Sequence, residues 1–217
     1  MRKEIIPILL ALALASLFGA GLVATRWFYS GRPVYLFLIW NLFLAWLPLL
    51  ASLSMPALRR SPALLLAAGI AWLLFLPNAP YLLTDLMHLG RWGDVPFWFD
   101  LLLLLLFGLT GLLLGFVSLE IVHALVDDLL GRAVGWLFAV TALVLSSLGV
   151  YIGRFLRWNS WDALLHPTDL VADLLALLQQ PWVHRQAYAF SIGLAALLVC
   201  AYIVLHFTPR IRKRAAC

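Results

Sequence analysis

Long apolar runs recur along the whole chain, and each has about the length that a helix needs to cross a membrane. A helix needs roughly 20 consecutive apolar residues to cross a hydrocarbon core about 30 Å thick. Leu and Ala dominate the runs, which lack the polar–apolar alternation of a membrane β-strand. The pattern predicts an all-α fold, a polytopic transmembrane helix bundle with six spans at residues 5–24, 34–55, 63–83, 97–118, 133–152 and 187–207.

Composition agrees with this fold class and excludes two others. Of the 217 residues, 65% are hydrophobic and 12% are charged, whereas a soluble domain is roughly 45–50% apolar and about 25% charged. A water-soluble fold is therefore excluded, and so is a disordered chain, which would be poor in apolar residues. No internal repeat or flexible linker divides the sequence, which predicts a single integral membrane domain over residues 1–217.

The distribution of basic residues predicts the orientation of the bundle. Six spans put both termini on one side, and that side carries nine of the fifteen Lys and Arg residues: Arg2, Lys3, Arg59, Arg60, Arg132, Arg210, Arg212, Lys213 and Arg214. The positive-inside rule then places both termini in the cytoplasm. The net charge of +5 follows from these flanking residues. We therefore expect the lipid bilayer as partner and no nucleic acid.

The first apolar run has an alternative interpretation as a cleaved signal peptide. A basic start and the small residues Ala13 and Ala15 fit a cleavage site. The run continues to Ala24, however, which is longer than the apolar core of most signal peptides. We therefore favour an uncleaved membrane helix.

The third span is interrupted by Pro77 and Pro80, which flank Asn78. Each proline lacks an N–H group and clashes with the preceding helical turn. Asn78 lies about 21 Å along the helix, which is still within the outer leaflet. Two interpretations are open. The prolines form a kink in which Asn78 bonds to a neighbouring helix, or the broken helix lines a wet cavity.

Acidic and histidine side chains follow this break. Asp85 and His88 are three residues apart, so they share one face of a helix. Together with Asp162 they are the candidate catalytic residues. Asp85, His88 and His166 are weak candidate ligands for a divalent metal ion, the one cofactor that the sequence suggests.

A second polar segment follows the fifth span. Arg154 and Arg157 either form ion pairs with Asp100, Asp85 or Asp162, or they bind an anion such as a lipid headgroup. In the predicted topology both polar segments lie at the extracytoplasmic ends of their helices, where they can meet. The candidate residues for binding an anion or a substrate are Asn78, Arg154, Arg157, Trp158 and Asn159.

Four further features have structural interpretations. Residues 168–178 form an amphipathic surface helix between spans five and six, with Thr168 as its N-cap. The spacing of Gly111 and Gly115 favours close helix packing within the bundle, with dimerisation as the alternative. Asn41 is expected to hydrogen-bond between helices. Polar residues after the fourth span are expected to be a solvated cytoplasmic cluster, made of Glu120, His123, Asp127 and Asp128.

Two stretches resemble a known family. The segment Trp72 to Tyr81, followed by Asp85 and His88, and the segment Gly149 to Asp162 resemble the bacterial membrane family called domain of unknown function 1361. The similarity covers roughly spans two to six. The resemblance implies a multi-pass bacterial membrane protein, and it implies no activity or catalytic residue.

Three classes of function remain open. The first is a binding or accessory protein whose extracytoplasmic site binds a lipid headgroup or another anion. The second is a membrane-embedded, metal-dependent hydrolase or transferase, and the third is a small transporter whose interrupted third span lines the path. The sequence contains no P-loop and no G-x-S-x-G motif, so its status as an enzyme stays open. The oligomeric state is open as well.

Overall fold

The computed structural model describes the backbone of residues 2–215 and the side chains of residues 5–208. The described residues are mostly helical and contain no strand. Six helical segments are long and apolar enough to cross a membrane: Ile5–Ser30, Leu36–Leu58, Pro62–His88, Phe97–Leu130, Arg132–Leu156 and Arg185–Thr208. The all-α polytopic fold with six spans is therefore confirmed.

Several helices extend beyond the apolar runs that predicted them. Helix α1 (Arg2–Ser30) continues past Ala24, α5 (Phe97–Leu130) continues past residue 118, and α9 (Arg185–Ala215) continues past residue 207. With 34 residues, α5 measures about 51 Å along its axis. Hydropathy falls where polar residues begin, but the backbone stays helical because a helix satisfies its own hydrogen bonds whatever its side chains are.

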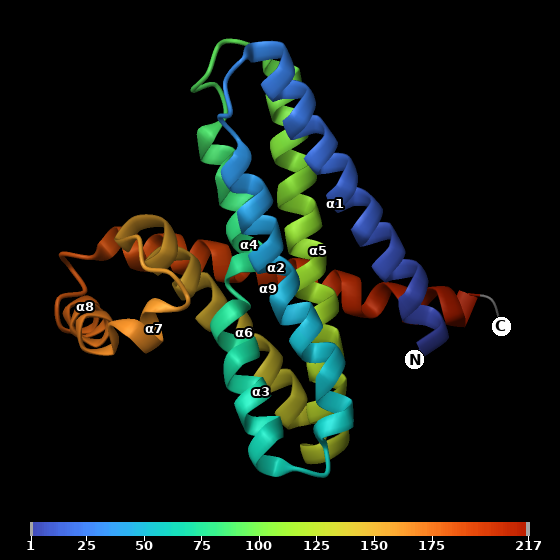
Figure 1. Cartoon of the computed structure of the whole chain (residues 1–217). Helices are drawn as coiled ribbons and strands as arrows, with labels where there is room; N and C mark the ends of the chain where they lie inside the picture. Colours follow the sequence, from blue (N-terminus) through green and yellow to red (C-terminus); the bar gives the residue numbers. More distant parts are fainter. Residues whose placement is uncertain (1, 216–217) are drawn as a thin grey trace. The chain divides into compact units, whose positions relative to one another are not determined.

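The chain divides into two compact units, Met1–Ser118 and Leu119–Cys217, with the boundary inside α5. The prediction of a single membrane domain stays a prediction. The first unit contains α1, the first part of α5, and α2 (Leu36–Ser54), η1 (Met55–Leu58), α3 (Pro62–Phe75), α4 (Asn78–Tyr81) and η2 (Leu82–His88). In this unit α2 packs against α3 and α4 (Figure 1).

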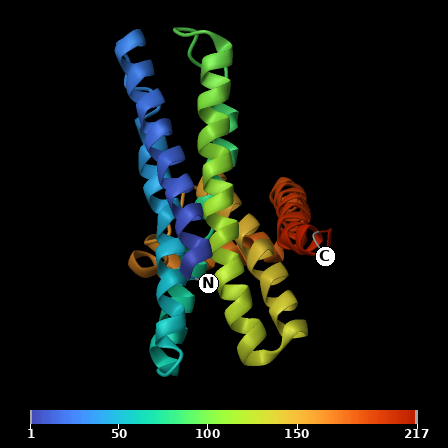
Figure 2. The same cartoon turned by 90° about the vertical axis from the view of Figure 1, so that its right-hand side faces the viewer.

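The second unit contains the end of α5, α6 (Arg132–Tyr151), η3 (Ile152–Leu156), α7 (Asp162–Leu165), α8 (Pro167–Gln179) and α9 (Arg185–Ala215). Helix α6 packs against α9. It also returns alongside the end of α5, where Gly135 lies against Asp127 (Figures 1 and 2). The sharp reversal between α5 and α6 uses Gly131, whose φ of 91° is strained for any residue with a Cβ.

The amphipathic helix between spans five and six is confirmed as α8, but its predicted start is wrong. The helix begins at Pro167, with His166 in the N-cap position and no side-chain capping bond. Proline is favoured at the first helical position because the N–H it lacks has no partner there and its φ is already helical. Thr168 therefore lies inside the first turn.

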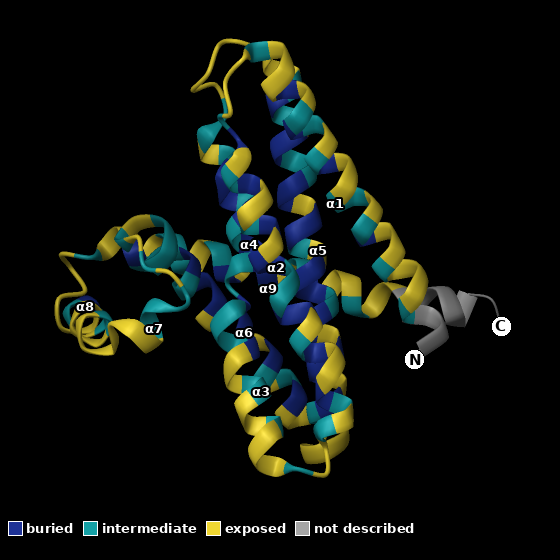
Figure 3. Ribbon diagram, in the orientation of Figure 1, coloured by how far each residue is buried: buried dark blue, intermediate teal, exposed yellow. Residues whose placement is uncertain are grey.

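Apolar side chains cover much of the surface of the described helices. Exposed positions run along these helices (Figure 3). Among the exposed large hydrophobic residues are Leu14, Leu17 and Phe18 on α1, and Leu66 and Ile70 on α3. Soluble proteins rarely expose so much contiguous apolar surface, whereas lipid-facing helices do. This surface fits a protein embedded in a bilayer.

Candidate functional site

The proline break in the third span is present and is local. Helix α3 ends at Phe75, and the chain resumes as the short helix α4 at Asn78. The side chain of Asn78 donates to the carbonyl oxygen of Phe75 at 3.0 Å. This bond gives the Phe75 carbonyl oxygen a donor in place of the backbone N–H group of Ala79, which bonds to Leu76 instead.

A glycine face of α5 packs against the broken segment. A Cβ atom at Gly111 would lie 2.6 Å from the carbonyl oxygen of Ala79, and one at Gly115 would lie 2.9 Å from the Cβ of Ala79. Such short distances mean that only glycine permits this approach. The prediction that these glycines mediate packing inside the bundle is confirmed.

Asp85 and His88 lie together on η2, as their spacing predicts. The Asp85 side chain is fully buried, and the Nδ1 atom of His88 lies 3.9 Å from its Oδ1 atom. Asn41 of α2 donates to the Oδ2 atom of Asp85 at 3.3 Å. The expected interhelical role of Asn41 is therefore confirmed.

Near this segment the first unit contains a buried ion pair that the sequence analysis missed. Arg26 donates from Nε and Nη2 to the two carboxylate oxygens of Asp100, at 2.7 and 3.1 Å. Only 1% of the Arg26 side chain is exposed. Asp100 therefore has its arginine partner in its own unit. The available signal was the position of Arg26 at the end of an apolar run, where a charge needs a partner.

Tyr35, which precedes the second membrane helix, completes this arrangement. Its hydroxyl donates to Asp100 at 3.3 Å, and its ring faces the guanidinium of Arg26 at 4.6 Å. Burial raises the pKa of Tyr35 to about 12, so the phenol keeps its proton. A pocket of about 210 Å³ adjoins Arg26 and is lined by Thr25, Arg26, Tyr29, Val95, Pro96, Trp98 and Phe99.

The second polar segment begins with an irregular turn. The π-helical turn η3 follows α6 and ends at Arg157, whose φ of 64° is the only positive value among the described residues other than glycine. The ring of Phe155 stacks on Tyr151 of α6 and meets Phe190 of α9 edge-on. These aromatic contacts fix η3, and with it Arg154, against the two long helices of the second unit.

Neutral donors engage two carboxylates of this segment. The indole N–H group of Trp158 donates to Asp173 at 2.8 Å. Asn159 donates to the Oδ2 atom of Asp162 from its backbone N–H group at 2.7 Å and from its side chain at 3.1 Å. His166 is exposed.

The candidate residues fall into two groups, one in each unit. The first unit brings together Asp85 and His88, with Asn78 earlier in the same segment. The second contains Arg154, Arg157, Trp158, Asn159, Asp162 and His166. The two groups lie in different units, and the expected meeting of the two segments stays a prediction.

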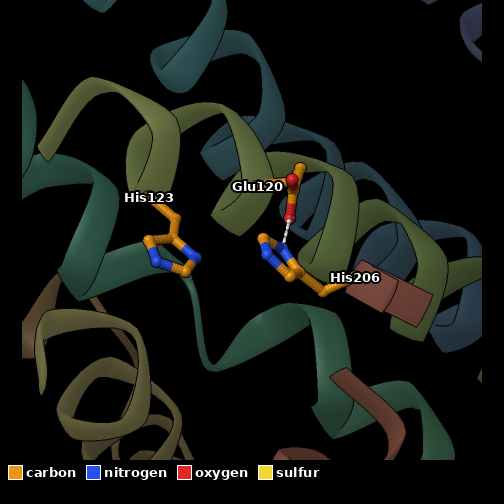
Figure 4. Close-up of side chains that lie close together, drawn as sticks. All are labelled: Glu120, His123 and His206. Carbon is orange, nitrogen blue, oxygen red and sulfur yellow. Dashed lines mark hydrogen bonds and ion pairs between the residues drawn. The ribbon is translucent and has the colours of Figure 1, made fainter. Parts of the chain in front are cut away.

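The polar residues near the end of α5 are only in part the solvated cluster that we expected, since Glu120 and Asp128 are exposed but His123 is not. His123 is buried, with 1% of its side chain exposed, and Glu120 binds His206 of α9 at 2.8 Å (Figure 4). The partners come from α9, more than 80 residues later in the chain, so the local sequence does not reveal them. The missed signal is the spacing Glu-x-x-His, which puts both side chains on one helix face.

Comparison with known proteins identifies a family. The family model described as "Protein of unknown function (DUF1361)" matches residues 40–201. No curated protein and no solved structure gives a significant match. Because the family model matches most of the 217 residues, the chain belongs to the DUF1361 family, as the resemblance of the two polar stretches implies.

Proposed function

We propose that this protein of the bacterial cytoplasmic membrane binds an anionic phosphate group, from a lipid headgroup or free in solution, through Arg154 and Arg157. In this proposal both termini lie in the cytoplasm. The segment of residues 152–184 then lies at the outer surface of the membrane, where lipid phosphates are concentrated. The positive-inside distribution of basic residues supports this orientation.

The conformation of Arg157 is the observation that carries the proposal. A residue with a Cβ in the left-handed region costs on the order of 1–3 kcal/mol and persists where the surroundings enforce it, often at ligand sites. Here the residue is an exposed arginine at the end of a π-helical turn, itself a feature frequent at functional sites. Arg157 has no ion pair within the described part of the chain. Its guanidinium group is therefore available to an external anion.

The surroundings of Arg157 favour a membrane-surface location. Leu164, Leu165 and Trp182 are largely exposed, as are Val171 and Leu178 on α8. An amphipathic segment with exposed leucine and tryptophan side chains binds at the boundary between headgroups and acyl chains. Arginine side chains next to such a segment meet phosphate groups, which they bind with two parallel hydrogen bonds.

Lipid retention tests this proposal. The purified protein is incubated with an equal mixture of phosphatidylglycerol and phosphatidylcholine, and bound lipids are counted by native mass spectrometry. Replacing both arginines (Arg154→Gln with Arg157→Gln) should weaken retention of phosphatidylglycerol at least about tenfold, since a hydrogen bond to a charged group contributes about 1.5–3 kcal/mol. Arg91→Gln, at an exposed arginine of the first unit, should have no effect.

A competition arm distinguishes the two sources of phosphate. If the site takes a lipid headgroup, millimolar inorganic phosphate should leave retention unchanged. If it takes free phosphate, the anion should bind the wild-type protein and not the double variant. Equal binding of both ligands by the wild type and the double variant would refute the proposal.

The other two functions have weaker support. A catalytic role for Asp85 needs access to substrate, but its side chain is fully buried beside Asn41. A transport path along the broken third span needs an open cavity, but α5 packs its glycines against α4. Broken helices at membrane depth are tolerated where protein covers them in this way.

A further inference from the structure

A cluster of metal-binding side chains lies in the second unit, away from the proposed anion site. Glu120 and His123 are one helical turn apart on α5, and His206 faces them from α9 (Figure 4). Each residue offers one ligand atom, and the three atoms lie within 4.8 Å of one another. His206 lies about 24 Å along α9 from Phe190, which contacts Phe155 beside Arg154. The cluster is therefore well separated from the proposed anion site.

We propose that Glu120, His123 and His206 bind a divalent transition-metal ion of the Zn²⁺ class. Two imidazoles and one carboxylate are a common protein ligand set for such ions, and this set leaves a coordination position open. Ligand atoms around a four-coordinate zinc ion, at about 2.1 Å from the metal, lie about 3.4 Å apart. The observed spread of up to 4.8 Å requires side-chain adjustments of about 1 Å.

The orientation of His123 fits a metal ligand. Its Nδ1 atom faces the hydroxyl group of Tyr202 at 2.8 Å, and that hydroxyl donates to Glu120 at 2.9 Å. Its Nε2 atom faces Asp127 at 3.4 Å. A metal-binding histidine usually turns its second nitrogen toward a carboxylate, which fixes the ring and strengthens the ligand. Asp127 has room for this position because residue 135 is glycine, whose missing Cβ would collide with the Asp127 carboxylate.

The surroundings of the two histidines combine burial with an entrance from solvent. The ring of Trp136 lies edge-on to His123 and His206, with centroids 5.0 and 4.9 Å away. His206 is 5% exposed, whereas 51% of the Glu120 side chain is exposed. The histidines are thus shielded from competing water, and an ion can reach them along the Glu120 side.

Tyr202 has a separate role in this proposal. Its hydroxyl lies between Glu120 and His123 in the metal-free arrangement. When the ion binds, it replaces this hydroxyl as the partner of His123, while the hydroxyl keeps donating to the coordinating Glu120 carboxylate and orients it. Tyr202 is therefore a positioning residue, and its loss should weaken metal binding by about 10- to 100-fold without abolishing it.

Metal loading of the purified full-length protein tests the proposal. The protein in detergent is treated with a chelator, incubated with Zn²⁺ or Mg²⁺, desalted and analysed by mass spectrometry of the elements. The wild type should retain about one Zn²⁺ per chain and no Mg²⁺, because Mg²⁺ prefers oxygen ligands. Glu120→Gln and His206→Gln should each lose the ion, and Tyr202→Phe should retain it with weaker affinity.

Controls separate metal binding from folding and from surface histidines. His166→Gln replaces an exposed histidine outside the cluster and should retain the ion. Glu120→Gln keeps the shape of a half-exposed side chain, so its elution profile should match that of the wild type. As a second readout, Co²⁺ should give the visible absorption of a tetrahedral site in the wild type and not in His206→Gln. Absence of Zn²⁺ from the wild type, or equal retention by Glu120→Gln, would overturn the proposal.

Discussion

Breaking the buried Arg26–Asp100 pair should destabilise the first unit strongly. Both side chains are buried, and two charge-assisted hydrogen bonds of 2.7 and 3.1 Å join them. Arg26→Met leaves the Asp100 carboxylate buried without its cation, which costs about 3–5 kcal/mol of unfolding free energy. Arg26→Met combined with Asp100→Leu removes both charges and should recover most of that loss. In this double variant the Tyr35 hydroxyl loses Asp100 as an acceptor but can still donate to the carbonyl oxygen of His88, 3.4 Å away.

Unfolding in mixed micelles with increasing denaturing detergent, followed by circular dichroism, measures these free energies. The two single variants and the double variant form a cycle, whose coupling energy should be at least about 3 kcal/mol. The matched control is Arg32→Met, which removes an exposed partner of Asp94 at 3.1 Å and should cost less than about 1 kcal/mol. A loss no larger for Arg26→Met than for Arg32→Met would refute the reasoning.

Two further predictions concern packing and topology. Gly111→Ala puts a Cβ atom 2.6 Å from a backbone oxygen of α4, so it should lower the unfolding free energy by about 1–3 kcal/mol. The control Gly21→Ala should leave the unfolding free energy unchanged, because no atom lies within 4 Å of the added Cβ. Equal stability of the two variants would contradict this prediction. In a chain without its two native cysteines, His88→Cys and Ser160→Cys should both react with an impermeant maleimide added to intact cells, and Arg60→Cys should react only after lysis. Labelling of positions 88 and 160 from opposite sides would refute the proposed topology.

The existence of each membrane helix was predictable from the length of its apolar run, but the positions of the helix ends were less predictable. All six apolar runs correspond to helices, because a helix that crosses the membrane needs about 20 consecutive apolar residues and such a run is visible in the sequence. The ends of α1 and α5 were placed too early, because Arg26 and Glu120 lower the local hydropathy although each lies inside a helix and is bonded to a residue of another helix. Hydropathy does not distinguish a polar residue with a partner from one in a loop.

The candidate residues were predictable only where their partners lie nearby in sequence. The spacing of Asp85 and His88 predicted their contact on η2. The pairing of Arg26 with Asp100, and of Glu120 with His206, joins helices more than 70 residues apart. Such contacts depend on which helix faces which, and a single sequence does not contain that information in any local pattern.

The pairing of Arg26 with Asp100 also bears on how the protein enters the membrane during synthesis. Each charge alone opposes insertion of its helix, although by less than the roughly 2.5–3.5 kcal/mol of a charge at mid-membrane, because Arg26 and Asp100 both lie near helix ends. The two residues are 74 positions apart, so the arginine emerges from the ribosome well before the aspartate. The first helix therefore reaches the membrane with its arginine still unpaired, and the buried pair can form only after the fourth hydrophobic segment has arrived.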